Sequence, residues 1–254
     1  MQRCYIPPDQ WREDRLPLDN KEKHHLVHVL RLAAGTPVCA FDGRGREART
    51  HLEWDNTSEN AYLQVLECKE AQSQPAGMEW IVVPAIIKGT RMDSLIEKAT
   101  ELGANRIIPI QTSRCVVRLN PAQAAKKVER WQRISISAAK QCGTPQLPEI
   151  EAVRNLTDVL RTLRTQNTPI LLGSLSGNPQ PLARKAKDLL DQKPDSIAFI
   201  TGPEGDFTPD EYAQLQNDHC IPVSLGPLTL RAETANIYAL SVMQAVHQEM
   251  QTQN

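Results

Sequence analysis

The sequence is poor in aromatic side chains, which make up 4% of its 254 residues, and it has no long apolar run. None of its apolar stretches approaches the roughly 20 residues that cross a bilayer as a helix. The first residues also lack the apolar core of a secretory signal peptide. The composition, 40% hydrophobic and 23% charged, is typical of soluble globular proteins, and the length predicts two domains. We therefore expect a two-domain protein that is neither secreted nor embedded in a membrane.

Closely spaced cysteines are missing as well. The six cysteines lie at positions 4, 39, 68, 115, 142 and 220, and no CxxC pair occurs. His24 and His28 are four residues apart, a spacing that suits two metal ligands on one helix, but no third ligand is evident. The sequence therefore predicts no metal site, and reduced thiols in a cytoplasmic protein.

Several common catalytic motifs are also absent. The sequence contains neither GxGxxG nor GxxxxGK(S/T), so it has neither the dinucleotide fingerprint nor the P-loop. It lacks the nucleophile elbow of the α/β-hydrolases and the HExxH helix of zinc proteases. These absences exclude the commonest ways of binding a triphosphate or cleaving a peptide.

Charge is distributed unevenly along the chain, although the net charge is only −1. Residues 84–145 hold 11 Lys and Arg against 4 Asp and Glu, whereas residues 1–83 hold 10 against 13 and residues 146–254 hold 8 against 13. A basic block between two acidic ones is typical of a surface that faces a polyanion. A solvated helix face would carry the same charges, and both interpretations stay open here.

Residues 1–72 are predicted to form a small β-rich domain, because short apolar runs alternate there with turn signals such as Asp42-Gly43-Arg44-Gly45. Residues 21–31 fit a short helix with Leu26, Val29 and Leu30 facing inward. The polar segment 71–77, which contains Pro and Gly, is interpreted as a linker.

From Trp80 onward the pattern changes to alternating strands and helices, which predicts a parallel sheet covered by helices. A threonine at position 90 is expected to cap the first of these helices. Strands are expected at 80–87, 106–110, 169–172, 197–201 and 221–225, and helices at 91–102, 121–142, 156–163, 182–190 and 232–250.

The chain is organised around one stretch, residues 197–211. Five mostly apolar residues predict a buried strand, and Gly202-Pro203-Glu204-Gly205 breaks it. Thr208, Pro209 and Glu211 then have the spacing of a capping box that starts a helix. Strand, glycine turn and helix start are typical of a ligand site in an α/β sheet, although a plain tight connection would look similar.

Glycine follows three predicted strands in the same way, at Gly173, at Gly202 to Gly205 and at Gly226. Because the carboxyl ends of parallel strands share one edge of a sheet, we expect these turns to converge. Their apolar flanks and exposed backbone groups suit a purine ring and a ribose better than a triphosphate.

At these residues the sequence resembles the SPOUT methyltransferases of the RsmE type. The motifs that carry the resemblance are Gly202-Pro-Glu-Gly205, Leu225-Gly-Pro227 and Leu230-Arg-Ala-Glu-Thr-Ala235, preceded by Glu97-Lys-Ala-Thr-Glu-Leu-Gly103, Ile108-Pro109, Ser113-Arg-Cys115 and Gln141-Cys-Gly143, and in the first domain by His25, Val29-Leu-Arg31 and Phe41-Asp-Gly43. They occur in order over nearly the whole chain.

The resemblance implies an α/β fold with a PUA-like RNA-binding β-barrel over residues 1–72 and a SPOUT methyltransferase domain over residues 78–254. It also implies a deep trefoil knot, a homodimer, and S-adenosylmethionine as methyl donor. The implied substrate is uridine 1498 of 16S rRNA, methylated at N3 in the assembled small ribosomal subunit.

Site residues can be placed on these motifs. Arg231 is the candidate cation that stabilises the uracil anion. Glu204 or Glu233 is the candidate that orients Arg231 or accepts the proton from uracil N3. Glu233 would also suit the first turn of a helix, where a negative charge is favourable. Cofactor contacts are expected at Leu172, Gly173, Thr201, Gly202, Pro203, Gly205, Leu225, Gly226, Leu230, Ala232 and Thr234, and RNA contacts at His25, Arg31, Lys88, Arg91, Lys98, Arg114, Arg118 and Gln141.

The sequence departs from the family pattern at four places. Asp206 stands where glycine is common, and Leu228 where arginine is frequent. Thr144 and Gln146 occupy positions where arginines are often seen, and Lys140 one that is often acidic. The changes bear on RNA contacts more than on the cofactor. Two alternatives therefore stay open: an RNA-binding module without chemistry, or a methyltransferase of another RNA such as tRNA.

Overall fold

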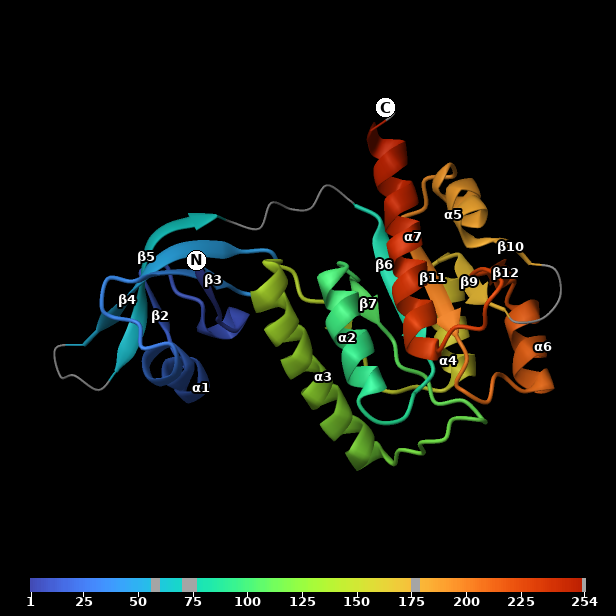
Figure 1. The fold of residues 1–254 in the computed structure, drawn as a ribbon, viewed down its shortest axis with the longest axis horizontal. Coiled ribbons are helices and arrows are strands. Elements are labelled where there is room, and N and C mark those ends of the chain that lie inside the picture. Colours follow the sequence, from blue (N-terminus) through green and yellow to red (C-terminus); the bar gives the residue numbers. More distant parts are fainter. Residues whose placement is uncertain (56–59, 70–76, 175–178, 253–254) are drawn as a thin grey trace. The chain divides into compact units, whose positions relative to one another are not determined.

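A computed structural model of the protein describes residues 1–55, 60–69, 77–174 and 179–252. The chain forms two compact units, drawn in Figure 1. The first comprises Met1–Ala76 with Ile136–Leu147, and the second comprises Gly77–Ser135 with Pro148–Asn254. The predicted linker, residues 71–77, lies outside the described residues except for Gly77. The sequence analysis assigned residues 78–254 to one domain and did not predict that residues 136–147 pack with the first unit.

The first unit is built on a mixed five-stranded sheet in the order β1-β3-β4-β5-β2. Only β1 and β3 pair in parallel; the other neighbours are antiparallel. In β4, buried Ala48, Thr50 and Leu52 alternate with more exposed residues, as a strand with one core face requires. The strands are β1 Gln2–Tyr5, β2 Arg15–Pro17, β3 Pro37–Phe41, β4 Glu47–Trp54 and β5 Ala61–Lys69.

The predicted helix over residues 21–31 is present in a different form. A short α-helix, α1 (Asn20–Lys23), continues into a π-helical segment, η2 (His24–Val29), and Arg31 leaves it at φ 53°. Leu26 is buried as predicted, but the inward placement of Val29 and Leu30 was wrong, since they are 58% and 38% exposed. The wider i to i+5 bonding of a π-helix rotates later residues away from the face that α-helical spacing predicts.

Residues 136–147 attach to the first unit by backbone and charge contacts. The Leu147 amide donates to the Gly43 carbonyl at 2.9 Å, and the Gly45 amide donates to Pro145 at 3.1 Å. Lys140 forms an ion pair with Glu22 of α1. The basic residue at position 140 thus has an acidic partner within the same unit.

The second unit contains a seven-stranded sheet, all of whose pairings are parallel, in the order β10-β12-β9-β11-β6-β7-β8. Its strands are β6 Glu79–Pro84, β7 Arg106–Ile107, β8 Glu149–Ile150, β9 Ile170–Gly173, β10 Gln180–Pro181, β11 Ser196–Thr201 and β12 Ile221–Ser224. The predicted parallel α/β architecture is therefore confirmed. The strand expected at 106–110 is shorter than predicted, and Gly173, Thr201 and Ser224 end three neighbouring strands.

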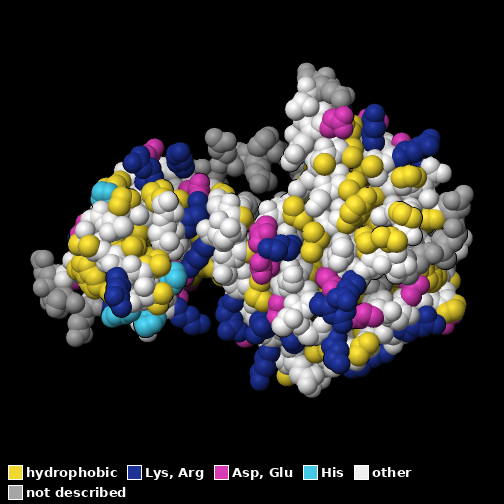
Figure 2. Space-filling model, in the orientation of Figure 1, with side chains coloured by type: hydrophobic (Ala, Val, Ile, Leu, Met, Phe, Trp, Pro, Cys, Tyr) yellow, Lys and Arg dark blue, Asp and Glu magenta, His cyan; other side chains and the backbone are white. Residues whose placement is uncertain are grey.

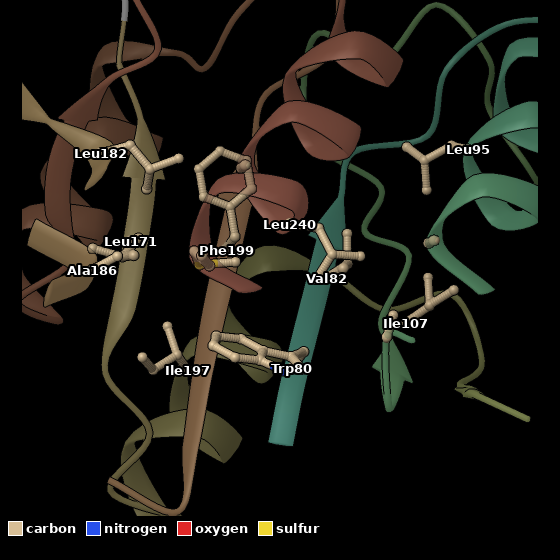
Figure 3. Packing of buried hydrophobic residues seen from close by; sticks show 14 of the residues in the cluster. Trp80, Val82, Leu95, Ile107, Leu171, Leu182, Ala186, Ile197, Phe199 and Leu240 are labelled. Atoms are coloured by element: carbon tan, nitrogen blue, oxygen red, sulfur yellow. The ribbon is translucent and has the colours of Figure 1, made fainter. Parts of the chain in front are cut away.

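Helices cover both faces of this sheet. On one face Trp80, Val82 and Phe199 pack against α2, α5 and α7, as Figure 3 shows. On the other, Ile81, Val83 and the neighbouring strands pack against α4 and α6. The helices are α2 Arg91–Glu101, α3 Pro121–Cys142, α4 Leu156–Thr165, α5 Leu182–Leu190, α6 Pro209–Asn217 and α7 Ala232–Thr252.

Two predicted helix caps have different outcomes. At α6 the capping box is complete, because the Glu211 amide donates to Thr208 Oγ1 at 3.2 Å and the Thr208 amide donates to Glu211 Oε2 at 2.8 Å. At α2, Thr90 occupies the predicted N-cap position, but its side chain makes no capping hydrogen bond, so the position is confirmed and the cap itself is not. Thr90 has helical φ and ψ of −79° and −6°, whereas a capping side chain needs the extended conformation.

The structure was also searched for membrane-spanning helices, metal sites and disulfides. In the described part of the chain, no helix has both the length and the hydrophobicity that a bilayer crossing demands. Among the same residues, no three His, Cys, Asp or Glu side chains gather as ligands for a metal ion. All six cysteines are described, and none forms a disulfide.

Candidate functional site

The three glycine-bearing turns lie together at one edge of the second unit's sheet. Strands β12, β9 and β11 are neighbours and parallel, so their carboxyl ends point the same way. Between their turns and the start of α7 lies a cavity of about 300 Å³. Its walls are Arg91, Gly173, Ser174, Thr201, Gly202, Pro203, Glu204, Asp206, Leu225, Gly226, Leu228, Thr229, Leu230, Arg231, Ala232 and Ala235. The volume of this cavity is at the low end of the range for small-molecule binding sites.

A buried asparagine holds the end of β11 against α7. Asn236 donates from Nδ2 to Thr201 Oγ1 at 2.7 Å and to the Ala232 carbonyl at 2.8 Å. Both Asn236 and Thr201 are at least 95% buried, so these bonds form away from water. Sequence reasoning missed Asn236; the only signal was a polar residue on the apolar face of the last helix.

Glu211 fixes the far end of the same loop. Besides Thr208, its carboxylate accepts a hydrogen bond from the Ser113 amide at 2.7 Å, which joins the loop before α6 to residues 111–118. Burial raises the pKa of Glu211, but the hydrogen bonds donated by Thr208 and Ser113 outweigh burial, and the net shift is downward.

This shift predicts a pH-dependent effect of Glu211→Gln. A carboxyl whose pKa is lower in the folded chain stabilises the fold above its unfolded pKa, and the contribution is lost as the pH falls through the folded pKa. The variant should lower the free energy of unfolding at pH 7 by about 1 kcal/mol. The difference from wild type should shrink between about pH 5 and pH 3. Urea unfolding across this range measures it; a difference that does not change with pH would contradict the assignment.

The cavity walls carry four charged side chains in three different states. Arg91 Nη2 and Glu204 Oε1 form an ion pair at 2.8 Å. Asp206 accepts hydrogen bonds from the Tyr212 hydroxyl at 2.8 and 3.0 Å. Arg231 is exposed, and its guanidinium has no hydrogen-bond or ion-pair partner among the described residues. It is therefore the cavity cation that stays available to an anion from outside the chain.

The structure brings most of the predicted cofactor residues together. Eight of them line the cavity: Gly173, Thr201, Gly202, Pro203, Leu225, Gly226, Leu230 and Ala232. Three do not. Leu172 is buried in the core on the sheet face covered by α4 and α6, Gly205 lies against Arg114, and Thr234 is exposed on α7.

The two candidate acids differ in position. Glu204 lines the cavity, whereas Glu233 does not. Glu233 is half-buried in the first turn of α7, and its Oε2 has no partner among the described residues. That position suits a negative charge near a helix N-terminus. Sequence reasoning missed Ser174, Thr229 and Ala235 as cavity residues, although each lies within three residues of one that was predicted.

Several predicted RNA contacts are engaged within the chain. Arg91 pairs with Glu204, and Lys98 pairs with Glu97 and Glu101 at 2.9 and 2.8 Å. The guanidinium of Arg114 donates to the carbonyls of Gly205 and Phe207, and that of Arg118 donates to the carbonyls of Thr112 and Ser113. By contrast, His25, Arg31, Lys88 and Gln141 have no side-chain hydrogen bond or ion pair with the described residues.

Basic side chains also gather on α3, outside the set predicted from sequence. Lys126, Arg130 and Arg133 are exposed on this helix, and basic residues are visible over this region in Figure 2. Arg130 pairs with Asp93 of α2 at 2.8 Å. The excess of positive charge in residues 84–145 is therefore partly neutralised by neighbours and partly exposed.

Comparison with known proteins identifies the family. Residues 74–244 match the model of the RNA methyltransferase domain, and residues 18–54 match that of the RNA methyltransferase PUA domain. The chain is 29% identical over 249 residues to ribosomal RNA small subunit methyltransferase E of Bacillus subtilis, covering 96% of each. It is 32% identical over 244 residues to the Synechocystis protein of that name, covering 96% of this chain and 77% of that protein.

Solved structures agree with this assignment. A ribosomal RNA small subunit methyltransferase E from Neisseria gonorrhoeae, bound to S-adenosylmethionine, superposes with a TM-score of 0.82 at 29% identity, covering 97% of this chain and 98% of that one. A putative methyltransferase from Legionella pneumophila, in complex with the same cofactor, gives 0.81 at 30% identity and covers 96% of both chains. With the family models matched in both units and relatives of about 30% identity over nearly the full length, the chain belongs to the RsmE family of RNA methyltransferases.

Proposed function

We propose that this chain transfers a methyl group from S-adenosylmethionine to N3 of a uridine in 16S rRNA, uridine 1498 being the target that the family resemblance implies. The observation that carries the proposal is the cavity formed by the turns after β9, β11 and β12, with the unpartnered Arg231 on its wall. The curated relatives described above are named for ribosomal RNA of the small subunit, which supports that substrate.

The cavity suits the proposed donor. Leu225, Leu230 and Ala235 provide apolar surface for a purine ring. Thr201, Gly202, Gly226 and Ser174 contribute polar side-chain or backbone groups to the same walls. An added Cβ at Gly202 would come within 3.2 Å of the Phe207 ring and 3.3 Å of Asp206 Oδ1, so only glycine fits there without a shift. When bound, S-adenosylmethionine supplies an electrophilic methyl group at its sulfonium.

The chemistry requires a cation near uracil. N3 carries a proton that must leave before the nitrogen can attack, and the resulting imide is negative. A neighbouring positive charge lowers the pKa of N3–H and stabilises that anion. We assign this role to Arg231, because it lines the cavity without an internal partner.

Of the two candidate acids, Glu204 is the better placed to receive the proton. Its carboxylate lies on the cavity wall, whereas Glu233 stays outside the lining. Arg91 holds Glu204 at 2.8 Å, which fixes the direction of the carboxylate at the cavity wall. In this proposal Glu233 stabilises the start of α7 rather than taking part in proton transfer.

We also propose a homodimer that acts on the small ribosomal subunit in the cytoplasm. The apolar side chains of the last helix, Ile237, Leu240, Val242, Met243 and Val246, exceed what one sheet face needs, and they predict a dimer contact on this helix. Leu240 and Met243 are instead 1% and 0% exposed in the chain's own core, so they cannot serve this purpose. Ile237, Val242 and Val246 are partly exposed and remain as candidates, and the neighbouring Tyr238, which was not predicted, is 42% exposed. Light scattering that gave a monomer mass would contradict the dimer.

The test of function is methyl transfer from labelled donor. Purified protein, unmodified small subunits and labelled S-adenosylmethionine should label 16S rRNA at a uridine, which mass mapping locates. Label on transfer RNA alone would favour the alternative substrate. If the donor binds but labels no RNA, the chain would be a binding module, and the catalytic role of Arg231 would be wrong.

A further inference from the structure

Asp206 has an unusual place on the cavity wall. It follows Gly205 in the turn after β11 and adopts φ 59°, a conformation that glycine adopts freely and a side chain adopts at a cost. A residue held in this conformation on the wall of a cavity points to a role for its side chain.

The carboxylate of Asp206 is fixed in direction by neutral groups. Its Oδ1 accepts from the Phe207 amide at 2.8 Å and from the Tyr212 hydroxyl at 2.8 Å, and Oδ2 lies 3.0 Å from the same hydroxyl. Burial, together with the hydrogen bond and charge of Asp206, raises the pKa of Tyr212, so the hydroxyl stays protonated and continues to donate.

No cation neutralises this carboxylate within the described part of the chain. Arg91, on the same cavity, is engaged by Glu204 at 2.8 Å. Arg114 donates to the carbonyls of Gly205 and Phe207, at 3.2 and 3.1 Å, and is not within ion-pair distance of Asp206. The cavity therefore holds one carboxylate whose charge is balanced by an arginine and one, Asp206, whose charge is not.

We propose that Asp206 is a specificity-determining residue that makes the cavity bind the positively charged methyl donor in preference to the neutral product. This inference rests on the proposed function. Methyl transfer breaks the bond between the sulfonium and its methyl group, so the sulfur keeps the bonding pair and loses its positive charge. Charge at the sulfur is then the difference between donor and product that a carboxylate recognises best.

The size of the effect follows from Coulomb's law. A unit charge that faces another across a partly hydrated cavity changes binding on the order of tenfold. The ammonium and carboxylate of the methionine part are the same in donor and product. Interaction of Asp206 with those groups alone would change both affinities equally, which separates the two possibilities in an experiment.

Calorimetry of Asp206→Asn with three ligands tests the inference. S-adenosylmethionine and sinefungin, whose amine places a positive charge near the sulfonium position, should each bind about tenfold more weakly than to wild type. S-adenosylhomocysteine should change by less than about twofold. Higher ionic strength should reduce the preference of wild type for the charged ligands.

Two further variants separate charge from folding. Asp206→Gly suits the left-handed backbone and removes the charge, so it should show the same loss of preference as Asp206→Asn. Tyr212→Phe removes the hydrogen bond but keeps the charge, so the ratio of the donor and product affinities should stay within about twofold of wild type.

Equal weakening of all three ligands, or no change in either Asp206 variant, would overturn the inference and leave the proposed function standing. A wild-type protein that binds none of the three would overturn the proposed function, and this inference with it.

Discussion

Replacing Arg231 with alanine should lower kcat for methyl transfer about 100- to 1000-fold, the usual cost of removing a group that stabilises a charge formed in the transition state. Binding of S-adenosylmethionine should not weaken, because the donor is itself positively charged. Single-turnover assays on small subunits, with calorimetry on the same preparations, measure both quantities. Arg184→Ala is the matched control, since Arg184 is an exposed arginine of α5 outside the cavity.

The pH dependence distinguishes this role from a structural one. Because Arg231 lowers the pKa of uracil N3–H, its removal should move the rise of the pH–rate profile to higher pH. Arg231→Lys keeps the charge and should recover part of the rate. A variant with reduced rate at every pH and an unshifted profile would argue that Arg231 only supports the loop before α7.

The second large effect is expected at Gly226. This residue follows β12 at φ 112°, a conformation that β-branched side chains do not adopt without strain. Gly226→Val should displace the loop that forms one wall of the cavity and weaken donor binding at least tenfold. Calorimetry with S-adenosylhomocysteine measures the loss.

Gly35→Val supplies the control for backbone strain. Gly35 has φ 77° and, like Gly226, has no atom within 4 Å of an added Cβ, but it lies in the first unit. Both variants should therefore lose stability, and only Gly226→Val should lose ligand affinity. Equal affinities in the two variants would mean that the turn after β12 does not shape the binding site.

Local patterns predicted the second unit well. The bounds of α3 and α5 agree with those expected from sequence, because each helix carries an apolar face at three- and four-residue spacing between clear end signals. The capping box at Thr208 was also predicted from residue types alone, since its hydrogen bonds join residues three apart. Convergence of the three glycine turns followed from a general rule for parallel sheets.

Features that depend on distant partners were harder to predict. Arg91 looked like an RNA contact, because nothing local shows that Glu204 lies 2.8 Å from it. The π-helical turn that exposes Val29 is not signalled by apolar spacing. The short strands β1 and β2 were missed, since three or four residues carry too little periodicity. The trefoil knot, the dimer and the roles of single site residues stay predictions.

In this account, the turns after β9, β11 and β12 form a binding site for an S-adenosyl compound. Calorimetric titration of the wild-type protein with S-adenosylhomocysteine tests this binding site most directly. We predict one site per chain, and competition by S-adenosylmethionine at that site. An absence of binding at millimolar ligand, or binding that Gly226→Val leaves unchanged, would contradict it.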